Sequence, residues 1–175
     1  FTILYYYQTK TLRSYFFLFL ATFAVADIIG LSFWFNDLTK LNFDYTYYIC
    51  NSLYIMSYVF LIIMVLKSMN LREVIMKLPA HIVILVVLDI FCVTIVTDTT
   101  KQELSIYQYS LEFLYNTVIM SLLTLSVINY IYKVDKTSMN LLIGSLFIVF
   151  SEMIQLAYYY VLELNILNVL CSLFL

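Results

Sequence analysis

The segment LLIGSLFIVFSEMIQLAYYYVLEL (141–164) is long and apolar enough to cross a lipid bilayer as a single helix. One acidic residue, Glu152, lies close to its middle. A charged side chain at the centre of a bilayer costs about 2.5–3.5 kcal/mol on insertion scales, and such residues are commonly functional. The segment therefore predicts a membrane helix and raises the question of why it carries Glu152.

The whole chain shares this apolar character. Of its 175 residues, 64% are hydrophobic and 11% are charged, whereas a soluble domain carries about 25% charged residues. Apolar runs of about 20 residues recur along the sequence, and the ten-residue segments of alternating polarity that are typical of membrane β-barrels are missing from it. We therefore predict an all-α, polytopic transmembrane helix bundle that forms a single domain over residues 1–175.

The apolar runs also predict the helix boundaries. Helices are expected at about 14–35, 44–66, 79–97, 105–132 and 138–160, with a partial span at 1–7 and a further span that begins near 163. Both ends of the chain fall inside apolar runs, FTILYYY and LNILNVLCSLFL. We therefore expect both ends to be truncated relative to a longer protein.

The basic residues predict the orientation of these spans. Seven of the nine Lys and Arg residues fall in the segments 8–13, 67–78 and 133–137, and only two fall in the alternate loops. The positive-inside rule predicts that these three segments are cytoplasmic. The net charge of −2 gives no reason to expect binding to nucleic acid.

Four of the eleven acidic residues fall within predicted spans: Asp27, Asp89, Glu112 and Glu152. Counted from the predicted outer helix ends at 1.5 Å per residue, each lies roughly 10–12 Å deep. We therefore expect one layer of carboxyl groups that faces the inside of the bundle, because lipid offers no hydrogen-bond partners. Paired carboxyl groups can act as general acid and base, but they can also simply hold helices together.

Polar neighbours extend two of these positions into stripes. Gln108 and Asn116 lie four residues on either side of Glu112, and Gln155 and Tyr159 follow Glu152 at helical spacing. The single His81 and three widely separated cysteines do not have the spacing of a metal site. We therefore predict no metal and no cofactor.

Three segments resemble YhhN-type membrane proteins, a family that includes the lysoplasmalogenases: FFLFLATFAVADIIGL (16–31), YNTVIMSLLTLSVINYIY (115–132) and GSLFIVFSEMIQLAYYY (144–160). The family pattern has Gly-Asp in the early helix and Ser-Asp in the later one, where this chain has Ala26-Asp27 and Ser151-Glu152. The resemblance covers most of the chain in the same helix order. It implies about eight helices in the full protein, with the first missing and the last cut short here.

The resemblance implies an integral membrane hydrolase of the bacterial inner membrane. Its relatives cleave the vinyl ether bond of lysoplasmalogens, so the expected partner is a membrane lipid or lysolipid. Asp27 and Glu152 match the two catalytic aspartates of the family. A histidine that the family carries in the span 44–66 is replaced near Ser57. The residues expected to bind substrate are Ser57, Glu112, Asn116, Ser151, Gln155 and Tyr159.

Two other functions fit the same residues. Intramembrane acids also form proton relays, so a proton-coupled or small-solute transporter is one alternative. The second alternative is a catalytically inactive membrane scaffold of the same family, which the departures at Ala26 and Glu152 favour.

Overall fold

The structure is a computed structural model, and it describes residues 2, 14–35, 40–100 and 104–160. All the regular structure in this part of the chain is helical, which confirms the predicted all-α class. The predicted spans at 1–7 and from 163 onward lie outside the described residues, apart from Thr2.

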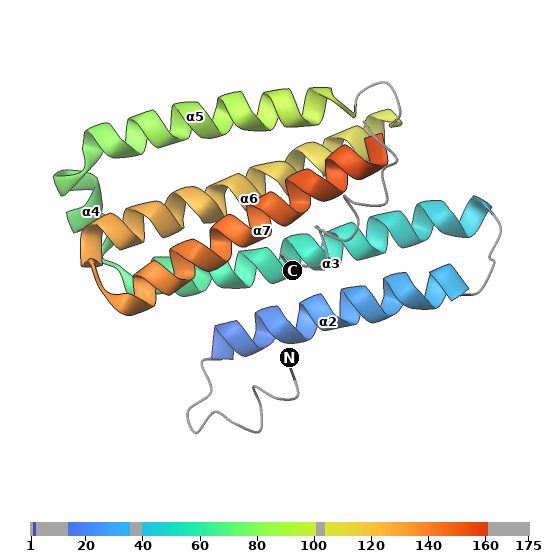
Figure 1. Ribbon diagram of the computed structural model, residues 1–175, viewed down its shortest axis with the longest axis horizontal. Helices are drawn as coiled ribbons and strands as arrows, with labels where there is room; N and C mark the ends of the chain where they lie inside the picture. Colours follow the sequence, from blue (N-terminus) through green and yellow to red (C-terminus); the bar gives the residue numbers. More distant parts are fainter. Residues whose placement is uncertain (1, 3–13, 36–39, 101–103, 161–175) are drawn as a thin grey trace. The chain divides into compact units, whose positions relative to one another are not determined.

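The described residues form the following helices (Figure 1): α2 (Ser14–Phe35), α3 (Lys40–Ser68), α4 (Leu71–Lys77), α5 (Pro79–Asp98), α6 (Ile106–Lys133) and α7 (Lys136–Tyr160). All except the short α4 are long and apolar enough to cross a membrane. The chain is thus a polytopic helical membrane protein, and the predicted boundaries agree to within four residues. The apolar runs do not predict helix α4, because the segment 67–78 is short and carries several charged residues.

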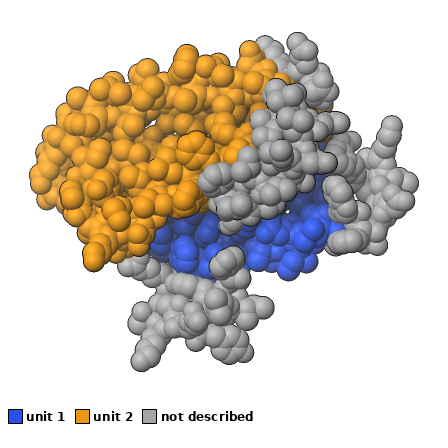
Figure 2. All heavy atoms as spheres, viewed as in Figure 1, with its two compact units in different colours: residues 1–67 blue, residues 68–175 orange. Residues whose placement is uncertain are grey.

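The chain divides into two compact units, residues 1–67 and residues 68–175 (Figure 2). Unit 1 contains α2 and nearly all of α3, and unit 2 contains α4 to α7. That the whole chain acts as a single domain stays a prediction.

Aromatic side chains hold α2 and α3 together in unit 1. The ring of Phe23 lies 5.1 Å from that of Tyr54 and 6.2 Å from that of Tyr58, measured between centroids. Ala26 is completely buried, and its carbonyl oxygen accepts a hydrogen bond of 3.8 Å from the Cys50 thiol. A small residue at this point lets the two helix backbones approach closely.

Helix α6 is the central element of unit 2, because both α5 and α7 pack against it. It begins with a capping box in which Ser105 and Gln108 bond each other's backbone N–H groups. The next helix, α7, begins in a similar way, since Asp135 Oδ1 accepts from the Ser138 N–H at 2.6 Å. Only Val134 and Asp135 separate α6 from α7, so these helices form an antiparallel hairpin.

Candidate functional site

The central helix α6 carries five buried polar side chains, which are distributed along its length and around its axis. None of them is more than 9% exposed, although the helix is predicted to cross the membrane. Polar groups in a span are stable when other helices supply hydrogen-bond partners. The members of this α6 polar set are Glu112, Asn116, Thr124, Ser126 and Asn129.

Two hydrogen bonds connect the α6 polar set to α5. The Asn116 side chain donates to the hydroxyl of Thr97 at 3.2 Å. The Thr124 hydroxyl donates to Asp89 Oδ1 at 2.9 Å. The two bonds are eight residues apart on each helix, so they lie about 12 Å apart along the helix axes. They fix the antiparallel register of α5 and α6.

This register shows that Asp89 and Glu112 do not lie at the same depth, so the prediction of one layer of carboxyl groups was wrong for this pair. Asp89 is level with Thr124, which lies twelve residues from Glu112, or about 18 Å along α6. The prediction assumed that α5 ends where α6 begins. Instead, Thr97 near the end of α5 pairs with Asn116, ten residues after α6 begins, so α6 extends well beyond α5.

The position of Glu152 relative to α6 follows from the register of the α6–α7 hairpin. It comes sixteen residues after α7 begins, so it lies at about the level of the α6 residues that are sixteen positions before the end of that helix, close to the level of Asn116. Glu152 and Gln155 are half-buried, and Ser151 is fully buried. Tyr159 lies within α7, but its side chain is outside the described residues. Glu152 therefore belongs to the level of the Asn116–Thr97 bond.

The other predicted catalytic residue, Asp27, lies on α2 in unit 1. Its Oδ1 atom accepts a hydrogen bond of 2.7 Å from the hydroxyl of Tyr54 on α3. The Asp27 side chain is exposed, whereas Ser57 on the next turn of α3 is completely buried. The Ser57 hydroxyl donates to the Tyr54 carbonyl oxygen at 2.7 Å, so this hydrogen bond stays within α3.

The structure thus brings Asp27 together with Tyr54, and Asn116 together with Thr97. Sequence reasoning missed Tyr54 and Thr97, which each carry a hydroxyl group within an apolar run. The predicted action of Asp27 with Glu152 stays a prediction, because the two residues belong to different units.

Within the part of the chain that the structure describes, no three His, Cys, Asp or Glu side chains gather closely enough to hold a metal ion.

Comparison of the sequence with models of protein families, with curated proteins and with solved structures gives no match. The resemblance to YhhN-type proteins therefore rests on the three sequence segments 16–31, 115–132 and 144–160, and the function that it implies is a proposal.

Proposed function

We propose that the chain is an integral membrane hydrolase of the YhhN type that cleaves the vinyl ether bond of lysoplasmalogen-like lipids in the bacterial inner membrane. The observation that carries this proposal is the environment of Asp27. A catalytic carboxyl group must be accessible to substrate and also held in place. The Asp27 carboxyl is exposed, and the Tyr54 hydroxyl holds it at 2.7 Å within a candidate membrane span.

The chemistry requires two carboxyl groups with different roles. Glu152, as the acid, would protonate the vinyl carbon that is not bonded to oxygen, which leaves an oxocarbenium ion. Asp27, as the base, would take a proton from water while the water oxygen attacks that ion. The resulting hemiacetal breaks down to a fatty aldehyde and a glycerophospho-alcohol. Asp27 suits the role of the base because its Oδ1 atom already accepts a hydrogen bond from the Tyr54 hydroxyl.

The direct test is release of fatty aldehyde from lysoplasmalogen by the purified full chain in lipid vesicles. We expect Asp27→Asn and Glu152→Gln each to lower the rate at least about a hundredfold, the usual effect of removing a general acid or base. Tyr54→Phe should lower it less, because the carboxyl group itself remains. Asp89→Asn is the matched control and should leave the rate close to that of the wild type.

The outcomes separate the elements of the proposal. A folded wild type that releases no aldehyde would exclude the enzymatic activity on this substrate. Release that survives both Asp27→Asn and Glu152→Gln would exclude the mechanism with two carboxyl groups while leaving the activity in place.

A second candidate function is proton-coupled or small-solute transport, which the length of the α6 polar set favours. The set extends seventeen residues from Glu112 to Asn129, or about 25 Å, close to the roughly 30 Å of a bilayer core. Buried polar and acidic residues within a membrane span are typical of proton pathways. The test is proton uptake by vesicles that contain the chain and a pH-sensitive dye. Uptake should be lost in Glu112→Gln, and an uptake equal to that of empty vesicles excludes this function.

A further inference from the structure

We propose that α4, together with the adjoining ends of α6 and α7, binds the phosphate headgroups of anionic phospholipids at the membrane surface. This inference is independent of the proposed hydrolase activity. It concerns the headgroup surface, defined here as residues 71–78 and 132–136. The surface lies at the ends of the candidate spans Pro79–Asp98, Ile106–Lys133 and Lys136–Leu156 (Figure 1).

Helix α4 is short and amphipathic. Leu71, Val74, Ile75 and Leu78 follow the spacing of one helix face, with charged residues between them. Val74 is only 2% exposed and anchors this face in unit 2. In contrast, Leu71, Ile75 and Met76 are 45%, 60% and 65% exposed. Exposed apolar side chains next to the end of a membrane span suit the boundary between headgroups and acyl chains.

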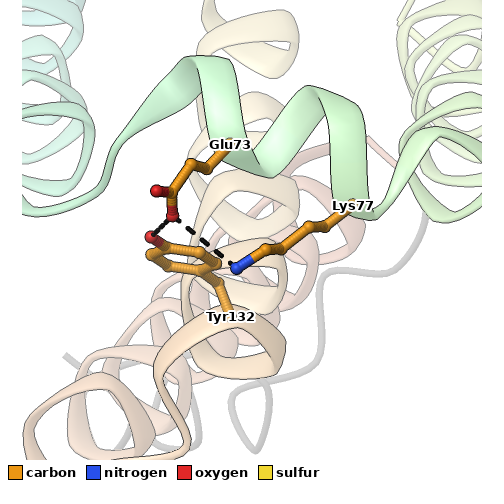
Figure 3. A network of polar contacts seen from close by, with 3 residues as sticks. All are labelled: Glu73, Lys77 and Tyr132. Atoms are coloured by element: carbon orange, nitrogen blue, oxygen red, sulfur yellow. Dashed lines mark hydrogen bonds and ion pairs between the residues drawn. The ribbon is translucent and has the colours of Figure 1, made fainter.

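Three polar side chains fix α4 to the end of α6 (Figure 3). The Tyr132 hydroxyl donates to Glu73 Oε2 at 2.6 Å. The Lys77 ammonium lies 3.7 Å from the same oxygen and 5.8 Å from the centroid of the Tyr132 ring. The position of α4 relative to α6 is therefore set before any lipid binds.

The charge of the headgroup surface favours an anionic ligand. It contains four exposed basic residues and two acidic residues, Glu73 and Asp135. Both acidic groups already accept hydrogen bonds, Glu73 from Tyr132 and Asp135 from Ser138. The exposed basic residues are Arg72, Lys77, Lys133 and Lys136. Basic residues grouped beside membrane spans attract anionic lipid headgroups.

The exposed apolar side chains and the basic charge together favour a phospholipid over a soluble anion. Phosphate alone would satisfy Arg72 and Lys136, but it offers nothing to the exposed Ile75 and Met76. A phospholipid carries a phosphate group and acyl chains in one molecule, and the headgroup surface exposes both basic and apolar side chains. The surface also belongs to segments that the positive-inside rule places in the cytoplasm.

The experiment places the full chain in lipid nanodiscs with equal amounts of phosphatidylglycerol and phosphatidylcholine. Native mass spectrometry then gives the ratio of the two lipids that stay bound after release. We expect the wild type to retain mainly phosphatidylglycerol. The double variant Arg72→Gln/Lys136→Gln, which leaves Glu73, Lys77 and Tyr132 intact, should lower the ratio about tenfold.

The matched control Lys40→Gln/Lys101→Gln removes the same charge at positions that are predicted to lie on the other side of the membrane. It should keep the wild-type ratio. A wild type without preference between the lipids would overturn the proposal, and so would an equal fall in the control.

A measurement on the wild type alone guards against misfolded variants. Raising the salt concentration from about 0.05 M to about 0.5 M should reduce the preference, because exposed charges are screened over a shorter distance. A preference that does not respond to salt would contradict a role for Arg72 and Lys136. If glycerol phosphate displaces the phospholipid at comparable concentration, the apolar residues play no part and the assignment to a lipid is wrong.

Discussion

Val134 ends α6 with φ 50° and ψ 42°, in the left-handed region of backbone conformation. This region is unfavourable for L-residues in general and more so for a β-branched one. The Val134 N–H nevertheless donates to the Tyr130 carbonyl oxygen at 2.9 Å, and α7 begins two residues later. The tight connection between two antiparallel helices therefore imposes the conformation.

Val134→Gly should raise the free energy of unfolding by about 1 kcal/mol, because glycine adopts positive φ without a steric cost. Thermal unfolding of the full chain in detergent measures this change. Val134→Ala is the control and should give no comparable gain, since alanine also carries a Cβ atom. Equal effects of the two substitutions would show that the backbone at this position is not strained.

Glu73 provides a second prediction for a single residue. The hydrogen bond from Tyr132 and the nearby Lys77 ammonium hold the pKa of Glu73 below its ordinary value of 4.5. A lowered pKa in the folded state stabilises the protein above about pH 4.5, and this stabilisation is lost as the pH falls through the lowered pKa. Glu73→Gln should therefore be less stable than the wild type at pH 7, and this difference should be smaller near pH 3.

Chemical denaturation at both pH values tests this prediction. In a Tyr132→Phe background the effect of Glu73→Gln should shrink, because the main hydrogen-bond donor is gone. A difference between wild type and Glu73→Gln that stays constant from pH 7 to pH 3 would mean that the charge of Glu73 does not contribute.

At the level of elements, two side-chain hydrogen bonds join α5 to α6 at well-separated points. Most of α5 exposes large apolar side chains, as expected where a helix faces lipid. Its polar contacts with α6 include Thr97 with Asn116 and Asp89 with Thr124. Each bond removes a polar group from contact with lipid.

Thr97→Val and Thr124→Val should each lower the stability of the folded state by about 0.5–1.5 kcal/mol, as expected for a hydrogen bond between membrane helices. The double variant should show the sum of the two losses, because the sites are about 12 Å apart and share no partner. Unfolding in mixed micelles provides the measurement. A stability loss in the double variant that is much larger than the sum of the two single losses would indicate that α5 shifts its register once both bonds are removed.

The sequence predicted the elements better than it predicted their alignment. Apolar runs mark the spans directly, since the length of a run must match the bilayer. The side-by-side position of Asp89 and Thr124 depends on how far α6 extends past α5, which no local pattern encodes. Helix α4 was missed because Arg72, Glu73 and Lys77 made a seven-residue segment look like a loop. The spacing of Leu71, Val74, Ile75 and Leu78 was the signal that could have identified it.

In the candidate site, too, the sequence predicted a residue that stands out locally but not the residue on another helix that contacts it. Asp27 was predicted because an acid within an apolar run is conspicuous. Its partner Tyr54 was not predicted, since the chain has 17 tyrosines and nothing in the sequence distinguishes the one that reaches α2.

For the whole molecule, the order of the spans makes a prediction about membrane topology. Each of α5, α6 and α7 should cross the bilayer once, so residues 72 and 136 should lie on one side and residue 99 on the other. In a cysteine-free background, Arg72→Cys and Lys136→Cys should react with a membrane-impermeant maleimide only from the cytoplasmic side. Thr99→Cys should react only from the opposite side. Labelling of all three positions from the same side would contradict the three crossings.

The two bonds between α5 and α6 also have a mechanical consequence. A helix bonded to its neighbour at one point can rotate about that point. A helix bonded at two points about 12 Å apart can neither rotate nor slide against its neighbour without breaking a bond. Helices α5 and α6 should therefore tilt in the membrane together, as one rigid body. Any change in their tilt relative to α7 would be taken up at the two-residue connection, where Val134 adopts the left-handed conformation.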